Sequence, residues 1–325
     1  SYYNAIINWV KQRYDLIVTK EVINFVPGIV PGIGMAMNCF TQKGDKVMIQ
    51  PPVYHPFAWV TTRNERTLVI NPLKWENGMY RMDLDAFREQ IKGCKLFILC
   101  NPHNPGGVVW TEAELRAIAD ICYDEKVLVF SDEIHADLTL PPHTHRPFAT
   151  VSEKARMNSV TFMSPSKAFN MPGLSASHAL IFNEDLRKRF RIYMDAGELD
   201  MGHVFAFLSV EAAYSHGTEW LDQCLAYIQG NIDFVDEFLK KHAPKIKAIR
   251  PEASYLVWLD CRELELSQKD LNEFFVDKAH LALNDGEMFG KEGIGFMRLN
   301  VASPRCIIEK AMKQLADAYQ LYLSL

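Results

Sequence analysis

Short apolar segments alternate with amphipathic segments of helical length from residue 1 to about residue 185. Segments such as Lys95–Cys100 (KLFILC) and Val127–Ser131 (VLVFS) are apolar at consecutive positions, which suits strands buried on both faces of a sheet. Helices fit between them. Thr111–Asp124, for example, begins with a Thr-x-x-Glu capping box at Thr111 and Glu114. This alternation predicts an α/β fold with a mainly parallel sheet.

The predicted strands of this part are Lys46–Gln50, Thr67–Ile70, Lys95–Cys100, Val127–Ser131, Ser159–Met163 and His178–Phe182. After about residue 200 the pattern changes, and residues 200–243 are predicted to be helical. The later elements are a strand at Ser254–Leu259, a helix near Gln268–Ala279, a strand at Gly295–Asn300 and a helix that starts at Ser303-Pro304. We therefore expect a large domain (1–230) and a smaller α+β domain (231–325) that share a long helix.

Composition excludes several classes of protein. A net charge of −5 leaves no basic surface for nucleic acid, and no apolar run approaches the roughly 20 residues that a membrane span needs. The seven cysteines are scattered and form no CxxC pair, which is typical of reduced core residues in a cytoplasmic protein. His143 and His145 lie in a Pro-rich loop and give no metal-ligand pattern, so no metal is expected.

Four polar segments stand in or directly after predicted strands, where α/β proteins bind ligands. They are Cys100–Gly107 (CNPHNPGG), Ser131–His135 (SDEIH), Ser164–Phe169 (SPSKAF) and Arg298–Asn300. Each alone has a structural explanation: a turn, a cap, a solvated lysine or an ordinary ion pair. Their joint order and spacing favour a functional interpretation.

This ordered set resembles the signature of fold type I pyridoxal 5′-phosphate (PLP) enzymes, the aspartate aminotransferase superfamily. The resemblance covers nearly the whole chain, and it is closest to the MalY/PatB-like C–S lyases, which cleave cystathionine and related amino acids. It implies that Lys167 carries PLP as a Schiff base and removes the Cα proton of the substrate. It further implies that Asp132 pairs with the pyridine nitrogen, Asn104 donates to the phenolic oxygen and contacts the substrate, and Arg298 binds the substrate carboxylate.

The resemblance also assigns the remaining cofactor contacts. Tyr54 would stack on the pyridine ring and border the substrate, and His135 stands where many aminotransferases carry Tyr, which favours the lyase branch. The phosphate would bind near a helix predicted at Gly34–Thr41, on backbone N–H groups and side-chain hydroxyls. The backbone donors would be Val30 and Gly32, because Pro31 between them has no N–H. The hydroxyls would come from Ser164 and Ser166, which flank the lysine.

The sequence departs from the family pattern in two places. Eight residues after the lysine, where many aminotransferases place an Arg on the phosphate, the chain has Ser175. The chain opens with Ser1-Tyr2-Tyr3, without an initiator Met, and the N-terminal family segment that gives a phosphate-binding tyrosine to the neighbouring subunit has no counterpart. We therefore expect that some tens of residues are missing, either because the chain is a fragment or because its start is mobile.

The resemblance implies a homodimer with its active site at the subunit interface. The favoured reaction is β-elimination of L-cystathionine or a related S-substituted L-cysteine to pyruvate, ammonia and a thiol. The alternative is an aminotransferase, which would use the same residues with a keto-acid acceptor. A regulatory binder is a third possibility, although every expected catalytic side chain is present. A dehydrogenase is disfavoured because no G-x-G-x-x-G follows the first strand.

Overall fold

A seven-stranded sheet organises the larger part of the chain in the computed structural model, which describes residues 1–324. Its strand order is β1-β9-β8-β7-β6-β2-β3. The strands are β1 (Ile23–Val26), β2 (Lys46–Ile49), β3 (Thr67–Ile70), β6 (Cys94–Cys100), β7 (Leu128–Asp132), β8 (Ser159–Met163) and β9 (Ser177–Leu180). The five neighbouring strands β3, β2, β6, β7 and β8 are parallel, and β9 runs antiparallel to both β8 and β1. The predicted α/β fold with a mainly parallel sheet is confirmed, and only β1 was not predicted.

Helices cover both faces of this sheet because its central strands are apolar at successive positions. Leu96 and Ile98 of β6 enter one core, whereas Phe97 and Leu99 enter the opposite one. The first core is closed by α2 (Ile29–Phe40), α3 (Pro56–Arg63) and α7 (Glu184–Asp195). The second is closed by α4 (Leu84–Gln90), α5 (Glu112–Asp124) and α6 (Glu153–Met157). The capping box predicted at the start of α5 is confirmed.

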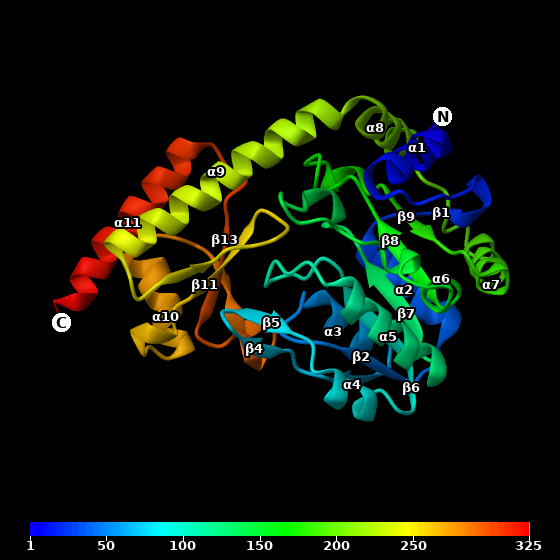
Figure 1. The fold of residues 1–325 in the computed structure, drawn as a ribbon, viewed down its shortest axis with the longest axis horizontal. Helices are drawn as coiled ribbons and strands as arrows, with labels where there is room; N and C mark the ends of the chain where they lie inside the picture. The colour runs from blue at the N-terminus through cyan, green and yellow to red at the C-terminus, as the bar shows by residue number, and fades with distance from the viewer. Residues whose placement is uncertain (325) are drawn as a thin grey trace.

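A four-stranded antiparallel sheet forms the second part of the molecule (Figure 1). Its order is β10-β11-β13-β12, with β10 (Lys247–Ile249), β11 (Leu256–Asp260), β12 (Asn284–Asp285) and β13 (Phe296–Asn300). It packs with α10 (Gln268–Glu273) and α11 (Arg305–Leu323). The last helix, α11, buries Ile308, Met312, Leu315 and Tyr319, which recur at the helical spacing of one face. A hairpin of β4 (Lys74–Glu76) and β5 (Met79–Arg81) reaches this sheet, because Trp258 Nε1 donates to Tyr80 Oη over 3.2 Å.

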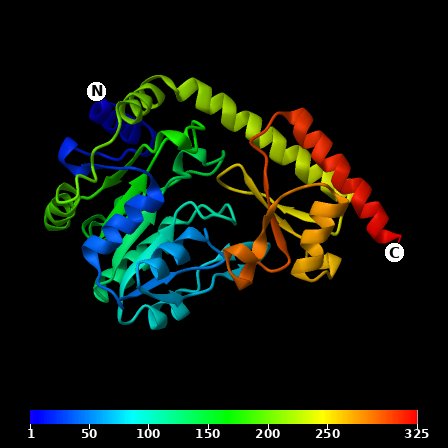
Figure 2. The same ribbon diagram turned by 180° about the vertical axis from the view of Figure 1, so that it is seen from behind.

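One long helix, α9 (Thr218–His242), links the two parts, and Figure 2 shows it running beside α11. The predicted boundary between residues 230 and 231 falls inside this helix. Before α9, the chain forms α8 (Val204–His216), which packs on α1 (Tyr2–Tyr14). Gly217 separates α8 from α9, and a Cβ there would collide with the Phe169 ring. Glycine therefore allows the helices to meet close to the loop that follows β8.

Among the helices of residues 1–324, none combines the length and the apolar composition of a membrane-crossing segment.

Candidate active site

A cavity of about 450 Å³ lies beyond the carboxyl ends of β6, β7 and β8 and is bounded on its far side by β13. In parallel sheets this edge collects side chains from several strands. Most residues predicted from the sequence line this cavity: Val30, Tyr54, Asn104, Asp132, His135, Ser166, Lys167 and Arg298. Gly32 and Ser164 do not line it.

Lys167 stands in a tight turn directly after β8. The Ser164 hydroxyl shapes this turn, because it donates to Ala176 O (2.7 Å) and accepts from the Ser166 N–H (3.1 Å). Ser164 therefore holds the loop, whereas Ser166 lines the cavity. Burial lowers the pKa of the Lys167 amine, and Arg298 lowers it further, whereas Asp132 opposes them. An amine with a lowered pKa is suited to act as a nucleophile and a base.

Asp132 ends β7 and is buried. One carboxylate oxygen accepts a hydrogen bond from the Ile134 N–H at 3.1 Å. Burial raises the pKa of Asp132 to about 7, and the neighbouring Glu133 carboxylate adds to the rise, while the Ile134 N–H and Lys167 oppose it. A cationic nitrogen placed against this carboxylate would offset its desolvation.

Arg298 reaches the cavity from the middle of β13. Its Nη1 donates to Asn104 Oδ1 and its Nη2 to Asn284 Oδ1, both over 2.8 Å, while its Nε is buried without a hydrogen-bond partner. Burial lowers the pKa of Arg298 to about 10, so the guanidinium remains a cation at neutral pH. Because Oδ1 of Asn104 is engaged by Arg298, the amide nitrogen is the group that remains for a ligand.

The amino terminus of α2 borders the cavity on another side. The helix begins at Ile29, five residues before the predicted start, and Gly28 caps it with φ 122°. The N–H groups of Ile29 and Val30 lie in the first turn, where a helix offers no backbone acceptor, so they are available to an anion.

Gly32 has a different role from the predicted one. Its N–H donates to Gly28 O (2.9 Å) inside the helix, so the prediction that it binds a phosphate is wrong. A Cβ at Gly32 would lie 2.9 Å from Val26 Cγ2 and 3.2 Å from the Phe162 ring, so glycine lets α2 approach the sheet. The Pro31-Gly32 pair suggested a helix boundary, but proline is tolerated in the first helical turn.

Tyr54 and His135 complete the wall of the cavity. Tyr54 precedes α3 and packs edge-on against Phe57. His135 is buried, and its Nδ1 has no hydrogen-bond partner. Burial, followed by the positive charges of Lys167 and Arg298, lowers the pKa of His135 to about 3. The imidazole is therefore neutral and can donate to, or accept from, a polar ligand.

Sequence reasoning missed Tyr255 and Asn284, which also line the cavity. Tyr255 precedes β11, and Asn284 lies in the two-residue strand β12 that pairs Asn284 with Arg298. A two-residue strand leaves no periodic pattern in the sequence, so nothing local marked Asn284 as a site residue. Its pairing with Arg298 becomes visible only in the folded structure.

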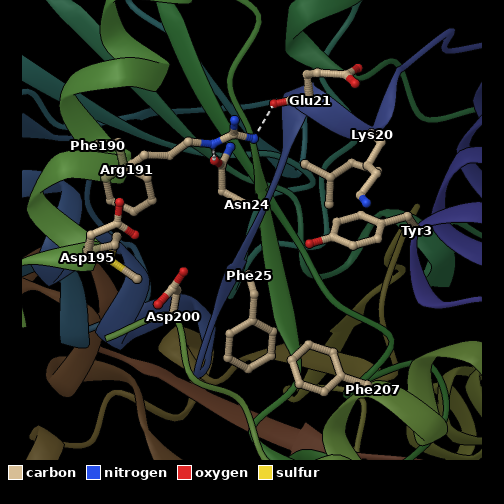
Figure 3. Close-up of a pocket in the computed structure, with 12 residues that line it drawn as sticks. Tyr3, Lys20, Glu21, Asn24, Phe25, Phe190, Arg191, Asp195, Asp200 and Phe207 are labelled. Atoms are coloured by element: carbon tan, nitrogen blue, oxygen red, sulfur yellow. Dashed lines mark hydrogen bonds between the residues drawn. The ribbon is translucent and has the colours of Figure 1, made fainter. Parts of the chain in front are cut away.

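A second cavity, of about 430 Å³, lies beside β1 and α7 and contains none of the predicted residues (Figure 3). The rings of Phe25 and Phe207 lie side by side in its wall, with centroids 5.1 Å apart. The Arg191 guanidinium is already engaged there, because it donates to Asn24 Oδ1 (3.0 Å) and Glu21 O (2.6 Å). The four polar segments singled out in the sequence contribute no residue to this cavity, so the site beyond β6–β8 is the candidate active site.

Residues 1–315 match the family model for aminotransferase class I and II. The chain is 38% identical to cystathionine beta-lyase PatB of Bacillus subtilis over 317 residues, which cover 97% of this chain and 82% of PatB. Two solved structures each superpose with a TM-score of 0.96 and cover 98% of this chain and 82% of their own. They are PLP-containing cystalysin from Treponema denticola (34% identical) and a PLP-bound putative aminotransferase from Clostridium difficile 630 (39% identical).

Proposed function

The chain belongs to the class I and II aminotransferase family, and on that premise we propose that it is a PLP-dependent carbon–sulfur lyase. Its substrate would be L-cystathionine or a related S-substituted L-cysteine. With one water molecule, the substrate is converted to pyruvate, ammonia and a thiol. The observation that carries the proposal is the convergence of Lys167, Asp132 and Arg298 on one cavity from three elements distant in sequence.

The polar groups of the cavity fit PLP. The buried Nδ1 of His135 and Nε of Arg298 have no partner within the described chain, as expected of groups that serve a polar ligand. Asp132 would hold the protonated ring nitrogen, and Tyr54 would cover the ring. The phosphate would bind the N–H groups of Ile29 and Val30 together with the Ser166 hydroxyl. When bound there, PLP supplies an electron-withdrawing ring that stabilises negative charge at the substrate Cα.

The chain's own residues then perform the steps around Cα. Arg298 binds the substrate carboxylate through two N–H groups, which fixes the orientation of Cα relative to the Lys167 amine. Lys167 takes the Cα proton, which its lowered pKa favours near neutral pH. Asn104 and neutral His135 hold the oxygen side of the cofactor. The thiolate leaves from Cβ, and water completes the conversion to pyruvate and ammonia.

Space for the sulfur substituent is available beside Lys167. A mainly apolar cavity of about 330 Å³ adjoins the active site and shares Lys167, Tyr255 and Asn300 with it. Trp220 and Tyr227 of α9 line its far side. A substrate with a bulky group on sulfur could occupy both cavities at once, which supports a thioether substrate.

Two further features belong to this proposal. We propose a homodimer, because four apolar side chains at and before the start of α8 are largely exposed: Met201, Val204, Phe205 and Leu208. We also propose a cytoplasmic location, which the seven unpaired cysteines support.

An aminotransferase is the alternative, because the same side chains serve both reactions. The resemblance to PatB over almost the whole chain favours the lyase. The test is to saturate the protein with PLP, add L-cystathionine without any keto acid, and measure pyruvate. Sustained release over many turnovers supports the lyase, with Lys167→Ala as the inactive control. A single half-turnover that resumes only after a keto acid is added would identify an aminotransferase and contradict the proposal.

A further inference from the structure

A second carboxylate lies next to Asp132 and does not reach the active-site cavity. The side chain of Glu133 is fully buried. Its Oε1 accepts hydrogen bonds of 2.8 Å from the Ser131 hydroxyl and from the Phe148 N–H, and its Oε2 lies 2.8 Å from His145 Nε2. These three hydrogen bonds restrict the Glu133 side chain to one position, because any other position would leave a buried carboxylate oxygen without a partner, which is strongly disfavoured.

Glu133 and Asp132 point to opposite faces of the end of β7, since side chains alternate along a strand. The preceding residues show the same alternation, because Val129 enters one core and Phe130 the other. The backbone between the two carboxylates is held as well: the Glu133 N–H donates to Phe162 O, and Asp132 O accepts from the Asn101 N–H, both over 2.9 Å. A side chain locked on one face therefore sets the direction of the carboxylate on the other.

The partner of Glu133 comes from the Pro-rich loop after residue 140. The His145 side chain is fully buried, and its ring packs edge-on against Tyr14 at a centroid distance of 5.5 Å. In the same loop, Arg146 O accepts a hydrogen bond of 3.2 Å from Asn101 Nδ2. The loop thus braces the ends of both β6 and β7, the two strands that carry Asn104 and Asp132 into the site.

We propose that Glu133 and His145 are positioning residues that aim the Asp132 carboxylate at the ring nitrogen of the cofactor. This inference rests on the PLP site of the proposed function. Burying this hydrogen-bonded pair costs desolvation that an apolar pair of similar volume would not. What the pair contributes is orientation: its hydrogen bonds allow only one position of the end of β7, and so only one direction of the Asp132 carboxylate.

The test compares Glu133→Ala and His145→Phe with wild type as holoenzymes. His145→Phe keeps an aromatic ring and removes only the bond to Glu133, so it remains informative if Glu133→Ala folds poorly. We expect PLP to bind about tenfold more weakly in both, the scale on which residues behind metal ligands act. The visible circular dichroism of the bound cofactor should also change, because its orientation relative to Asp132 is altered.

Two further variants separate positioning from general destabilisation. Glu133→Gln retains an acceptor for Ser131 and Phe148, and we expect it to recover most of the PLP affinity and dichroism. Ile118→Ala, in the buried face of α5, lowers the melting temperature away from the site and should leave PLP affinity unchanged. If Glu133→Ala and His145→Phe, like Ile118→Ala, lower the melting temperature without weakening PLP binding, the pair has only a structural role. That result overturns this inference and leaves the proposed function standing. Failure of wild type to bind PLP would overturn the proposed function as well.

Discussion

Arg298 and Asn104, 194 residues apart in the chain, are joined by a hydrogen bond of 2.8 Å between Nη1 and Oδ1. Arg298 belongs to the small sheet, and Asn104 to the loop after β6 of the large sheet. The bond therefore ties the two parts together at the point where cofactor and substrate would meet. It also orients both side chains, so the Arg298 guanidinium and the Asn104 amide nitrogen are in position before any ligand arrives.

Replacement of Lys167 by Ala should abolish both the visible absorbance of lysine-bound PLP and pyruvate release, because no other amine lines the cavity in the described residues. The measurement is the absorbance spectrum before and after borohydride reduction, followed by peptide mapping. Lys188→Ala is a matched control, since Lys188 is exposed and pairs with Glu184 on α7. A yellow species that persists in Lys167→Ala and reduces onto another lysine would refute the assignment.

Replacement of Asp132 by Asn should impair the reaction while stabilising the PLP-free protein at higher pH. In the folded protein burial raises the Asp132 pKa to about 7, above its usual value of 3.8. Between these values the folded form holds more protons than the unfolded form, so stability falls as pH rises from about 4 to about 7.

Asn carries no such charge, so the stability advantage of Asp132→Asn should grow between pH 5 and pH 8. Thermal unfolding of both PLP-free proteins at these pH values measures the change. An equal difference in melting temperature at the two pH values would show that the Asp132 pKa is not raised.

Replacement of Arg298 by Ala should mainly raise the KM for the amino acid substrate, by roughly ten- to a hundredfold for a lost charge-assisted hydrogen-bond pair. Arg298→Lys should be intermediate, because an ammonium keeps the charge but cannot bind a carboxylate with the guanidinium fork. Asn284→Ala is a useful comparison, since it removes one Arg298 contact and leaves the cation. Steady-state kinetics with the three variants measure the KM for the amino acid, and an unchanged KM in Arg298→Ala would count against the role of Arg298 in binding the substrate carboxylate.

Gly32→Ala tests the corrected role of that glycine. The added methyl group would overlap Val26 and the Phe162 ring, so the free energy of unfolding should fall by about 1–3 kcal/mol. PLP affinity measured at a temperature where the variant is folded should change little, because the Gly32 N–H stays in the helix. Urea unfolding and PLP titration are the two measurements. A large loss of affinity without a loss of stability would restore Gly32 as a phosphate ligand.

Local pattern was sufficient for much of this fold. Consecutive apolar residues identify strands such as β6 and β7, and the capping box and helical periodicity identify α5. The start of α2 was misplaced, because Pro31 and Gly32 are local signals of a boundary even though the first turn of a helix accepts both. The strand β1 was not predicted, because the polar Asn24 interrupts its short apolar run.

By itself the sequence determined the order of the motifs, and the resemblance they carry led us to expect Lys167, Asp132, Asn104 and Arg298 in one site. The structure places all four around one cavity. Only the tertiary structure decided what these residues touch: that Asn284 holds Arg298, that Ser164 shapes a turn, and that Glu133 is locked by His145. The reason is physical. Strand and helix patterns depend on neighbours two to four residues away, whereas these contacts depend on sheet order and on the angle at which two sheets meet.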